Sequence, residues 1–199
     1  MVQFPPQVIA FQYQSGLDRI VDAYSAATGS LWQTRSNADE AYWRYVDSGQ
    51  DDSEYDEDGC LTSSTAFELQ HAGQEADYAL RAVREAFITS TFHYWERWAR
   101  SATGLNGQND GFEKLRSAFS IKYPVSPHLR MLNHLNNVLK HNSDFHAVKL
   151  AKLNTSFFSR LPMPLIGSQR LYWMLRLTDS HVDEVFEIVR TSGPQYAVL

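Results

Sequence analysis

The segment between Thr65 and about Ser101 repeats apolar or aromatic residues, with one threonine among them, at every third or fourth position. The repeating positions are Leu80, Val83, Phe87, Thr91, Tyr94 and Trp98. Because an α-helix turns once in 3.6 residues, this spacing predicts a long amphipathic helix with one face in a core. Thr65-Ala66-Phe67-Glu68 has the form of a capping box and predicts where the helix begins. Near its end, Glu96 and Arg100 have the spacing of a helical ion pair.

Further helices are predicted on both sides of this segment, at residues 17–46, 110–119, 128–142 and 178–192. The first is interrupted near Gly29, which predicts two helices or one broken helix. Ser126-Pro127 predicts the start of the third, since Ser caps exposed amides and Pro fits the first turn. Thr178 caps the last helix, and Gly193-Pro194 ends it.

The remaining segments set the expected domain organisation. Residues 47–59, DSGQDDSEYDEDG, carry seven acidic side chains and no basic one, which predicts a solvated linker. Residues 145–177 are ambiguous and leave room for one short strand or hairpin, with a Pro-rich loop at 159–169. We therefore expect a mainly all-α fold. A helical segment and acidic loop at 1–60 would pack on a helical domain at 61–199.

Composition and cysteine use exclude several classes of protein. With 199 residues, 43% of them hydrophobic, the chain can bury a full core. No run of eighteen apolar residues occurs and no signal peptide is recognisable, so no membrane contact is predicted. Cys60 is the only cysteine, which excludes an internal disulfide and a cysteine-based metal site. A soluble cytoplasmic protein is expected.

Charge is distributed unevenly along the chain. Residues 1–80 carry 14 acidic and 3 basic side chains, whereas residues 81–199 carry 9 and 15. Within the second part, residues 112–176 hold ten Lys or Arg and only two carboxylates. A basic surface of this kind attracts a polyanion such as RNA. The alternative is that it docks against the acidic half of the chain or an acidic partner.

Residues 128–142, HLRMLNHLNNVLKHN, combine an apolar face with a very polar one. At about 100° per residue, Leu132, Leu135 and Leu139 fall on one side of the helix and should face the core. A polar strip lies opposite, made of Arg130, His134, Asn137 and His141. Asn and His are weaker helix formers than Lys or Gln, which suggests that they hydrogen-bond something specific. The alternative is an ordinary solvated face.

NNVLKHN, residues 136–142, resembles the signature helix of the HEPN superfamily, small helical domains of higher eukaryotes and prokaryotes that bind nucleotides. The family pattern has Arg, a polar residue, a short spacer and then His. Asn137 matches the polar position and His141 the histidine, while Asn136 stands where the family has Arg. The resemblance extends over roughly residues 62–192, through YWERWARS upstream and LRLTDSHVDEVFEIVRTSG near the end.

This resemblance implies an all-α HEPN-like bundle with an N-terminal helical extension. It also implies a homodimer in which two signature helices form one cleft that cleaves RNA without metal. By analogy, His141 would be the general acid or base, Asn137 would orient it, and Asn136 would occupy the position of the charge-stabilising arginine. The phosphate-binding groups would be Arg130, His134, Lys140 and Asn142.

Three functions remain open at this point. Because Asn136 carries no charge, the chain is either a metal-independent endoribonuclease or a catalytically degenerate relative that binds RNA or a nucleotide. Both fit a toxin, defence or stress system with an antitoxin or other protein partner. The alternative from another class is a non-catalytic helical module for dimerisation or protein interaction. No cofactor or metal is predicted, because the sequence contains no HExxH, GxGxxG, GxSxG or phosphate-binding glycine loop.

Overall fold

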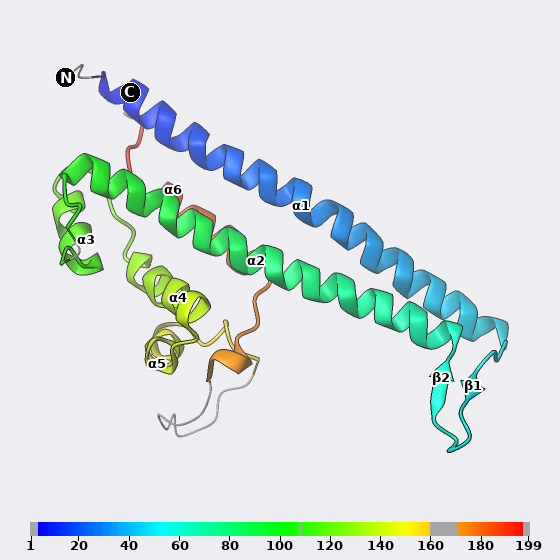
Figure 1. Cartoon of the computed structure of the whole chain (residues 1–199). Coiled ribbons are helices and arrows are strands. Elements are labelled where there is room, and N and C mark those ends of the chain that lie inside the picture. The colour runs from blue at the N-terminus through cyan, green and yellow to red at the C-terminus, as the bar shows by residue number, and fades with distance from the viewer. Residues whose placement is uncertain (1–3, 108, 160–170, 197–199) are drawn as a thin grey trace. The chain divides into compact units, whose positions relative to one another are not determined.

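The computed structural model describes residues 4–107, 109–159 and 171–196, and within them the mainly all-α fold is confirmed (Figure 1). None of the described helices has the length and apolar character needed to cross a membrane. The elements are α1 (Pro6–Ser48), β1 (Glu54–Tyr55), β2 (Leu61–Ser63), α2 (Thr65–Thr103), α3 (Phe112–Ser120), α4 (Leu129–His141), α5 (Asp144–Leu153), the 3₁₀ turn η1 (Leu171–Met174) and α6 (Asp179–Arg190).

The chain forms two compact units. Unit 1 consists of residues 1–22 and 84–199, and unit 2 of residues 23–83. The two long helices α1 and α2 each contribute to both units, whereas α3 to α6 belong to unit 1 alone. Residue 60, the boundary expected from the sequence, therefore lies inside unit 2.

Helix α1 runs without interruption through Gly29, so the predicted break is wrong. A glycine in a helix interior costs only about 1 kcal/mol relative to alanine. Tyr24, Thr28 and Ala38 are buried on one face of α1 on both sides of the glycine. The apolar face thus continues past Gly29, and its packing outweighs the local penalty.

Unit 2 pairs the second part of α1 with the first part of α2. Arg35 of α1 joins the two helices, because it donates to Asp39 at 2.6 Å and to Asp77 of α2 at 2.7 Å. Gly73 of α2 is buried beside Ala38, which allows the helices to approach closely. Several large apolar side chains of this unit are nevertheless exposed, among them Trp43, Tyr55, Phe67 and Tyr78.

The acidic segment contains more structure than a linker. Strands β1 and β2 pair antiparallel as a short hairpin, and Gly59 adopts a positive φ of 78° in the turn between them. The start of α2 also differs from the prediction by one residue. Ser64 Oγ accepts from the Phe67 amide at 3.1 Å, so Ser64 and not Thr65 is the cap.

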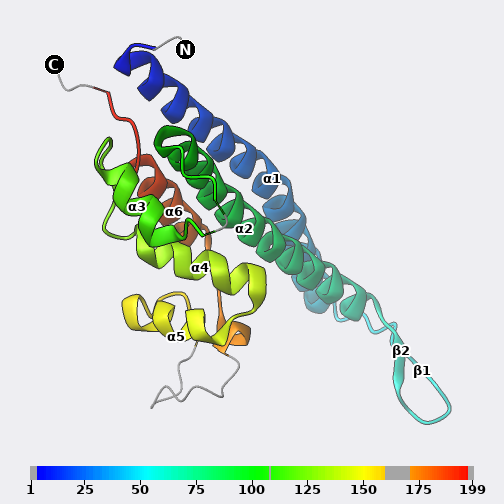
Figure 2. The ribbon, with the colours of Figure 1, turned by 60° about the vertical axis from the view of Figure 1, so that its left-hand side comes forward.

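The core of unit 1 is built around Trp95 of α2. Its ring is fully buried and contacts the rings of Phe92, Phe112 and Phe119, so α3 packs against α2. Helix α4 adds a second buried cluster, consisting of Leu129, Met131, Leu132, Leu135 and Val138. Figure 2 shows α4 and α5 running side by side within this unit.

The first turns of α1 are fastened to the end of α6. Tyr13 is fully buried, and its hydroxyl donates to the main-chain oxygens of Val189 at 2.6 Å and Ser192 at 3.0 Å. An exposed ion pair between Arg190 and Asp18, at 2.8 Å, lies nearby. A side chain at Gly193 would overlap the Tyr13 ring, so the absence of a Cβ there permits the contact.

The ambiguous region 145–177 is mainly helical where it is described. Residues 144–153 form α5, which Ser143 caps by accepting from the His146 amide at 3.4 Å. The only sheet-like pairing found in the described part of this region is one antiparallel bridge between Phe158 and Leu175. From residue 160 to its end, the predicted loop lies outside the described residues.

The predicted cap of the last helix is confirmed. Thr178 precedes α6 and forms a capping box in which His181 Nδ1 accepts from the Thr178 amide at 3.1 Å. The His181 ring also lies against Phe157, with centroids 4.6 Å apart. A neutral histidine therefore fixes the residues that lead into α6.

Candidate phosphate-binding groove

The polar strip of α4 faces two other helices of unit 1. Arg130 reaches Glu113 of α3, and His134 reaches His146 of α5. Leu132 and Leu135 on the opposite side are fully buried, as predicted, whereas Leu139 is half-buried. The N-terminal half of the strip is thus positioned by the buried leucines on the opposite face of α4.

Glu113 is held between two arginines. Arg130 donates to its carboxylate through Nε at 2.8 Å and Nη2 at 3.2 Å. Arg116 donates through Nε at 3.1 Å and Nη2 at 3.0 Å. Hydrogen bonds from Arg130 and then Arg116 lower the pKa of Glu113 below its ordinary value. The carboxylate stays ionised, and two arginines share one negative charge.

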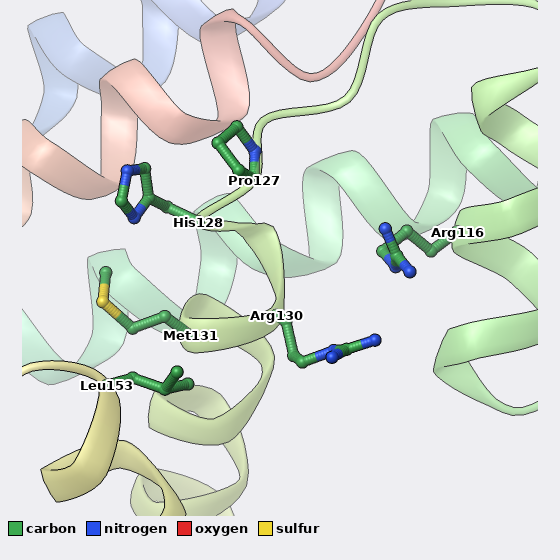
Figure 3. A pocket seen from close by; sticks show the side chains of 6 residues that line it. All are labelled: Arg116, Pro127, His128, Arg130, Met131 and Leu153. Carbon is green, nitrogen blue, oxygen red and sulfur yellow. The ribbon is translucent and has the colours of Figure 1, made fainter.

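Two adjoining pockets open beside this cluster. The first, of about 490 Å³, is shown in Figure 3 and is lined by Arg116, Pro127, His128, Arg130, Met131 and Leu153. The second, of about 380 Å³, is lined by Glu113, Arg130, His134, Lys149, Lys152 and Leu153. They share Arg130 and Leu153, and we call them together the α3–α4–α5 groove. In Figure 3 the side chains of Arg116 and Arg130 extend toward each other from α3 and α4.

The groove is cationic. Arg116, Arg130, Lys149 and Lys152 line it, and Glu113 is the one carboxylate among the lining residues. Lys149 is positioned by Phe145, since its Nζ lies 4.1 Å from the centre of that ring. An anion in the groove would therefore meet positive charge from all three helices.

A pair of histidines lies where α4 meets α5, and one of them, His134, lines the second pocket. The Nδ1 atoms of His134 and His146 lie 2.9 Å apart, with ring centroids separated by 5.1 Å. Burial, together with His146, Lys149 and Arg130, lowers the pKa of His134 to about 4. Burial and Lys149 also lower the pKa of His146. Both rings are therefore neutral near pH 7.

The structure brings only part of the predicted site into the groove. Lys140 and His141 are exposed and line neither pocket. Asn137 bends back along its own helix, where Nδ2 donates to the main-chain oxygen of Asn133 at 2.7 Å. The side-chain amide of Asn137 is therefore engaged by the backbone of α4.

The two remaining predicted positions, Asn136 and Asn142, line neither pocket. Asn136 is 3% exposed, and its Oδ1 accepts no hydrogen bond from the described residues. Asn142 ends α4 in the left-handed conformation, with φ 49°, and its amide donates to the Val138 oxygen. Asparagine tolerates this conformation better than most residues, which explains its place there.

Several groove residues were not singled out from the sequence. They are Glu113, Arg116, His128, Lys149 and Lys152, and His146, the partner of His134, was not singled out either. The excess of basic side chains in residues 112–176 indicated the region. Which of them converge depends on how α3 and α5 pack on α4, which no local pattern encodes.

The described residues contain no cluster of three or more His, Cys, Asp or Glu side chains that could hold a metal ion. No family model, curated protein or solved structure matches this chain.

Acidification should reduce stability through the histidine pair. The pKa of His134 is about 4 in the folded chain against its ordinary 6.5, so the unfolded chain binds the proton more readily. The stabilising contribution of neutral His134 is therefore complete above about pH 6.5 and is lost as the pH falls toward 4. Melting temperatures measured from pH 7.5 to 4.5 should fall more steeply for the natural chain than for His134→Gln. His71→Gln, at an exposed position paired with Glu75, should keep the natural slope. Equal slopes for the natural chain and His134→Gln would contradict this account.

Proposed function

We propose that the chain binds RNA, with the phosphate groups held in the α3–α4–α5 groove. The observation that carries the proposal is the convergence of Arg116, Arg130, Lys149 and Lys152 on two adjoining pockets. Such side chains neutralise phosphates, and arginine also matches phosphate geometry with paired donors. The pockets adjoin through Arg130, which suits a ligand with successive phosphates.

The rest of the lining fits a nucleotide chain better than a free anion. Pro127, Met131 and Leu153 provide an apolar wall beside the arginines, against which a base or ribose can pack. Glu113 can accept hydrogen bonds from sugar hydroxyls, which RNA has and other polyanions such as polyphosphate lack. The resemblance of residues 136–142 to the HEPN signature helix also favours RNA.

Binding should be dominated by charge and should fall with salt. We expect a fluorescein-labelled 12-nucleotide RNA to bind in a fluorescence anisotropy titration at 50 mM salt, with affinity decreasing linearly on a log–log plot against salt. Lys149→Gln should weaken binding and reduce the magnitude of the salt slope by about 1, because one phosphate contact is lost.

The matched control removes one positive charge elsewhere. Arg44→Gln, on α1 in unit 2, lines neither pocket and breaks only an exposed pair with Glu40. Its affinity and salt slope should equal those of the natural chain. AMP and inorganic phosphate, added as competitors, distinguish an RNA site from a mononucleotide or phosphate site.

Two results would reject the proposal. One is no RNA binding at 50 mM salt, and the other is an equal loss in Lys149→Gln and Arg44→Gln. Absence of binding would favour a protein-interaction module. The exposed aromatic side chains of unit 2, such as Trp43 and Tyr78, would then be the first candidates for its surface.

A further inference from the structure

The hydrogen bond between His134 and His146 restricts where their protons can be. The two Nδ1 atoms are 2.9 Å apart, so one must carry a hydrogen and the other must be bare. A neutral imidazole has one N–H in total. The ring that donates through Nδ1 therefore has a bare Nε2, and the ring that accepts through Nδ1 carries its hydrogen on Nε2.

The contact thus creates a base and an acid in one neutral pair. One Nε2 can take a proton while the other can give one. Neither Nε2 forms a hydrogen bond within the described part of the chain. His134 lines the second pocket of the groove, and His146 on α5 contacts the His134 ring.

We propose that His134 and His146 act as a proton relay that cleaves RNA bound in the α3–α4–α5 groove. This inference rests on the proposed binding of RNA there. In this relay both histidines are catalytic residues, because each exchanges a proton with a reacting oxygen of the substrate.

The reaction is a transfer of the phosphoryl group within the RNA. The ribose 2′-oxygen attacks phosphorus, a P–O2′ bond forms, and the P–O5′ bond breaks. The 2′-hydroxyl proton passes to the bare Nε2 of one ring, and the hydrogen on that ring's Nδ1 moves to the Nδ1 of the other. The second ring releases its Nε2 hydrogen to the departing 5′-oxygen. The products are a 2′,3′-cyclic phosphate and a 5′-hydroxyl, with the two rings' roles exchanged and no other reactant needed.

The charges around the pair suit this chemistry. Arg130 from α4 and Lys149 from α5 face the histidines, and they stabilise the negative charge that grows on the phosphate oxygens. Burial, with Lys149 adding to it, lowers the pKa of both rings and keeps them neutral, which the relay requires. Glu113 from α3 acts on His134 in the opposite sense, and His141 adds to the effect on His146.

The geometry and the resemblance assign the catalytic role to different histidines. The resemblance to the HEPN superfamily points to His141, which is exposed and lines neither pocket. The geometry points to His134, which lines the second pocket, and to His146, whose Nδ1 is hydrogen-bonded to that of His134. Separate substitution of the three histidines decides between them.

The test measures binding and cleavage of the same labelled 12-nucleotide RNA, with EDTA present throughout. The natural chain should cleave RNA to 2′,3′-cyclic phosphate ends, and it should bind matched DNA or 2′-O-methyl RNA without cleaving either. His134→Ala and His146→Ala should each lower the cleavage rate at least about 100-fold while RNA affinity changes little. The double variant should be no worse than either single one, because the two rings act as a unit.

Controls separate catalysis from folding. His71→Ala, on α2 in unit 2, should cleave at the natural rate. Circular dichroism melts check that each variant is folded. If an alanine variant is unfolded, His134→Gln and His146→Gln replace it, since glutamine retains a polar side chain of similar reach.

The pH profile distinguishes a relay from two independent histidines. A neutral pair predicts a rate that rises with pH and then stays level to about pH 8. Two independent histidines, one a neutral imidazole acting as base and the other an imidazolium acting as acid, predict a bell-shaped dependence of the rate on pH. A bell-shaped pH profile of the cleavage rate would overturn the relay. So would a loss of cleavage confined to His141→Ala. RNA binding without cleavage by the natural chain would also overturn it while leaving the proposed function intact, whereas absence of binding would reject both.

Discussion

Replacing Tyr13 with alanine should lower the free energy of unfolding by about 3–5 kcal/mol. The side chain is fully buried, with its ring 5.4 Å from Trp98 and 5.5 Å from Tyr94, measured between centroids. The substitution leaves a cavity in unit 1. It also leaves the main-chain oxygens of Val189 and Ser192 without the hydroxyl that donates to them.

Urea denaturation followed by circular dichroism measures this loss. Tyr13→Phe keeps the ring and removes only the hydroxyl, so it should cost about 1–3 kcal/mol. The difference between the two variants then reports the packing of the ring. If Tyr13→Ala were no more destabilising than Tyr13→Phe, the ring would not be part of the core.

Gly193→Ala should destabilise the chain by about 1–3 kcal/mol or more, because the new methyl group would overlap the Tyr13 ring. Gly29→Ala is the matched control. A Cβ at Gly29 meets no atom within 4 Å, and the residue lies inside α1. That substitution should stabilise the chain by about 0.5–1 kcal/mol.

The two large effects should be coupled. In the double variant, which combines Tyr13→Ala with Gly193→Ala, the ring that blocks the new methyl group is gone. Its stability should therefore be about that of Tyr13→Ala alone. Denaturation of all four members of the cycle provides the test. Simple addition of the two losses would mean that the methyl group introduced at position 193 meets something other than Tyr13.

Local patterns predicted the elements whose packing reinforces them. The long repeat of apolar residues indicated α2, and Thr178 marked the start of α6. Ser126-Pro127 indicated that a helix begins nearby, but the residue that precedes α4 is His128, without a side-chain cap. The expected break at Gly29 failed because a small local cost was outweighed by burial along the whole of α1. The hairpin β1–β2 was missed because its few exposed residues carry no alternation of polar and apolar side chains.

The groove was predictable only in part. Helical periodicity placed Arg130 and His134 on one face of α4, and the structure puts both in the groove. Their partners, Glu113 and His146, come from other helices, and a single sequence does not specify which residues of two helices will meet. Asn142 shows a second limit, since the same residue type suits a helix end and a phosphate contact, and only backbone geometry separates them.

The fastening of α1 to the end of α6 bears on how the chain folds as it is made. The Tyr13 hydroxyl donates to the main-chain oxygen of Val189, so its acceptor leaves the ribosome 176 residues later. Until then the apolar face at the beginning of α1 has no cover from α6. Contacts so distant in sequence form late and slowly. The nascent chain therefore cannot complete unit 1 before residue 192 has been made, and until then the beginning of α1 exposes apolar surface.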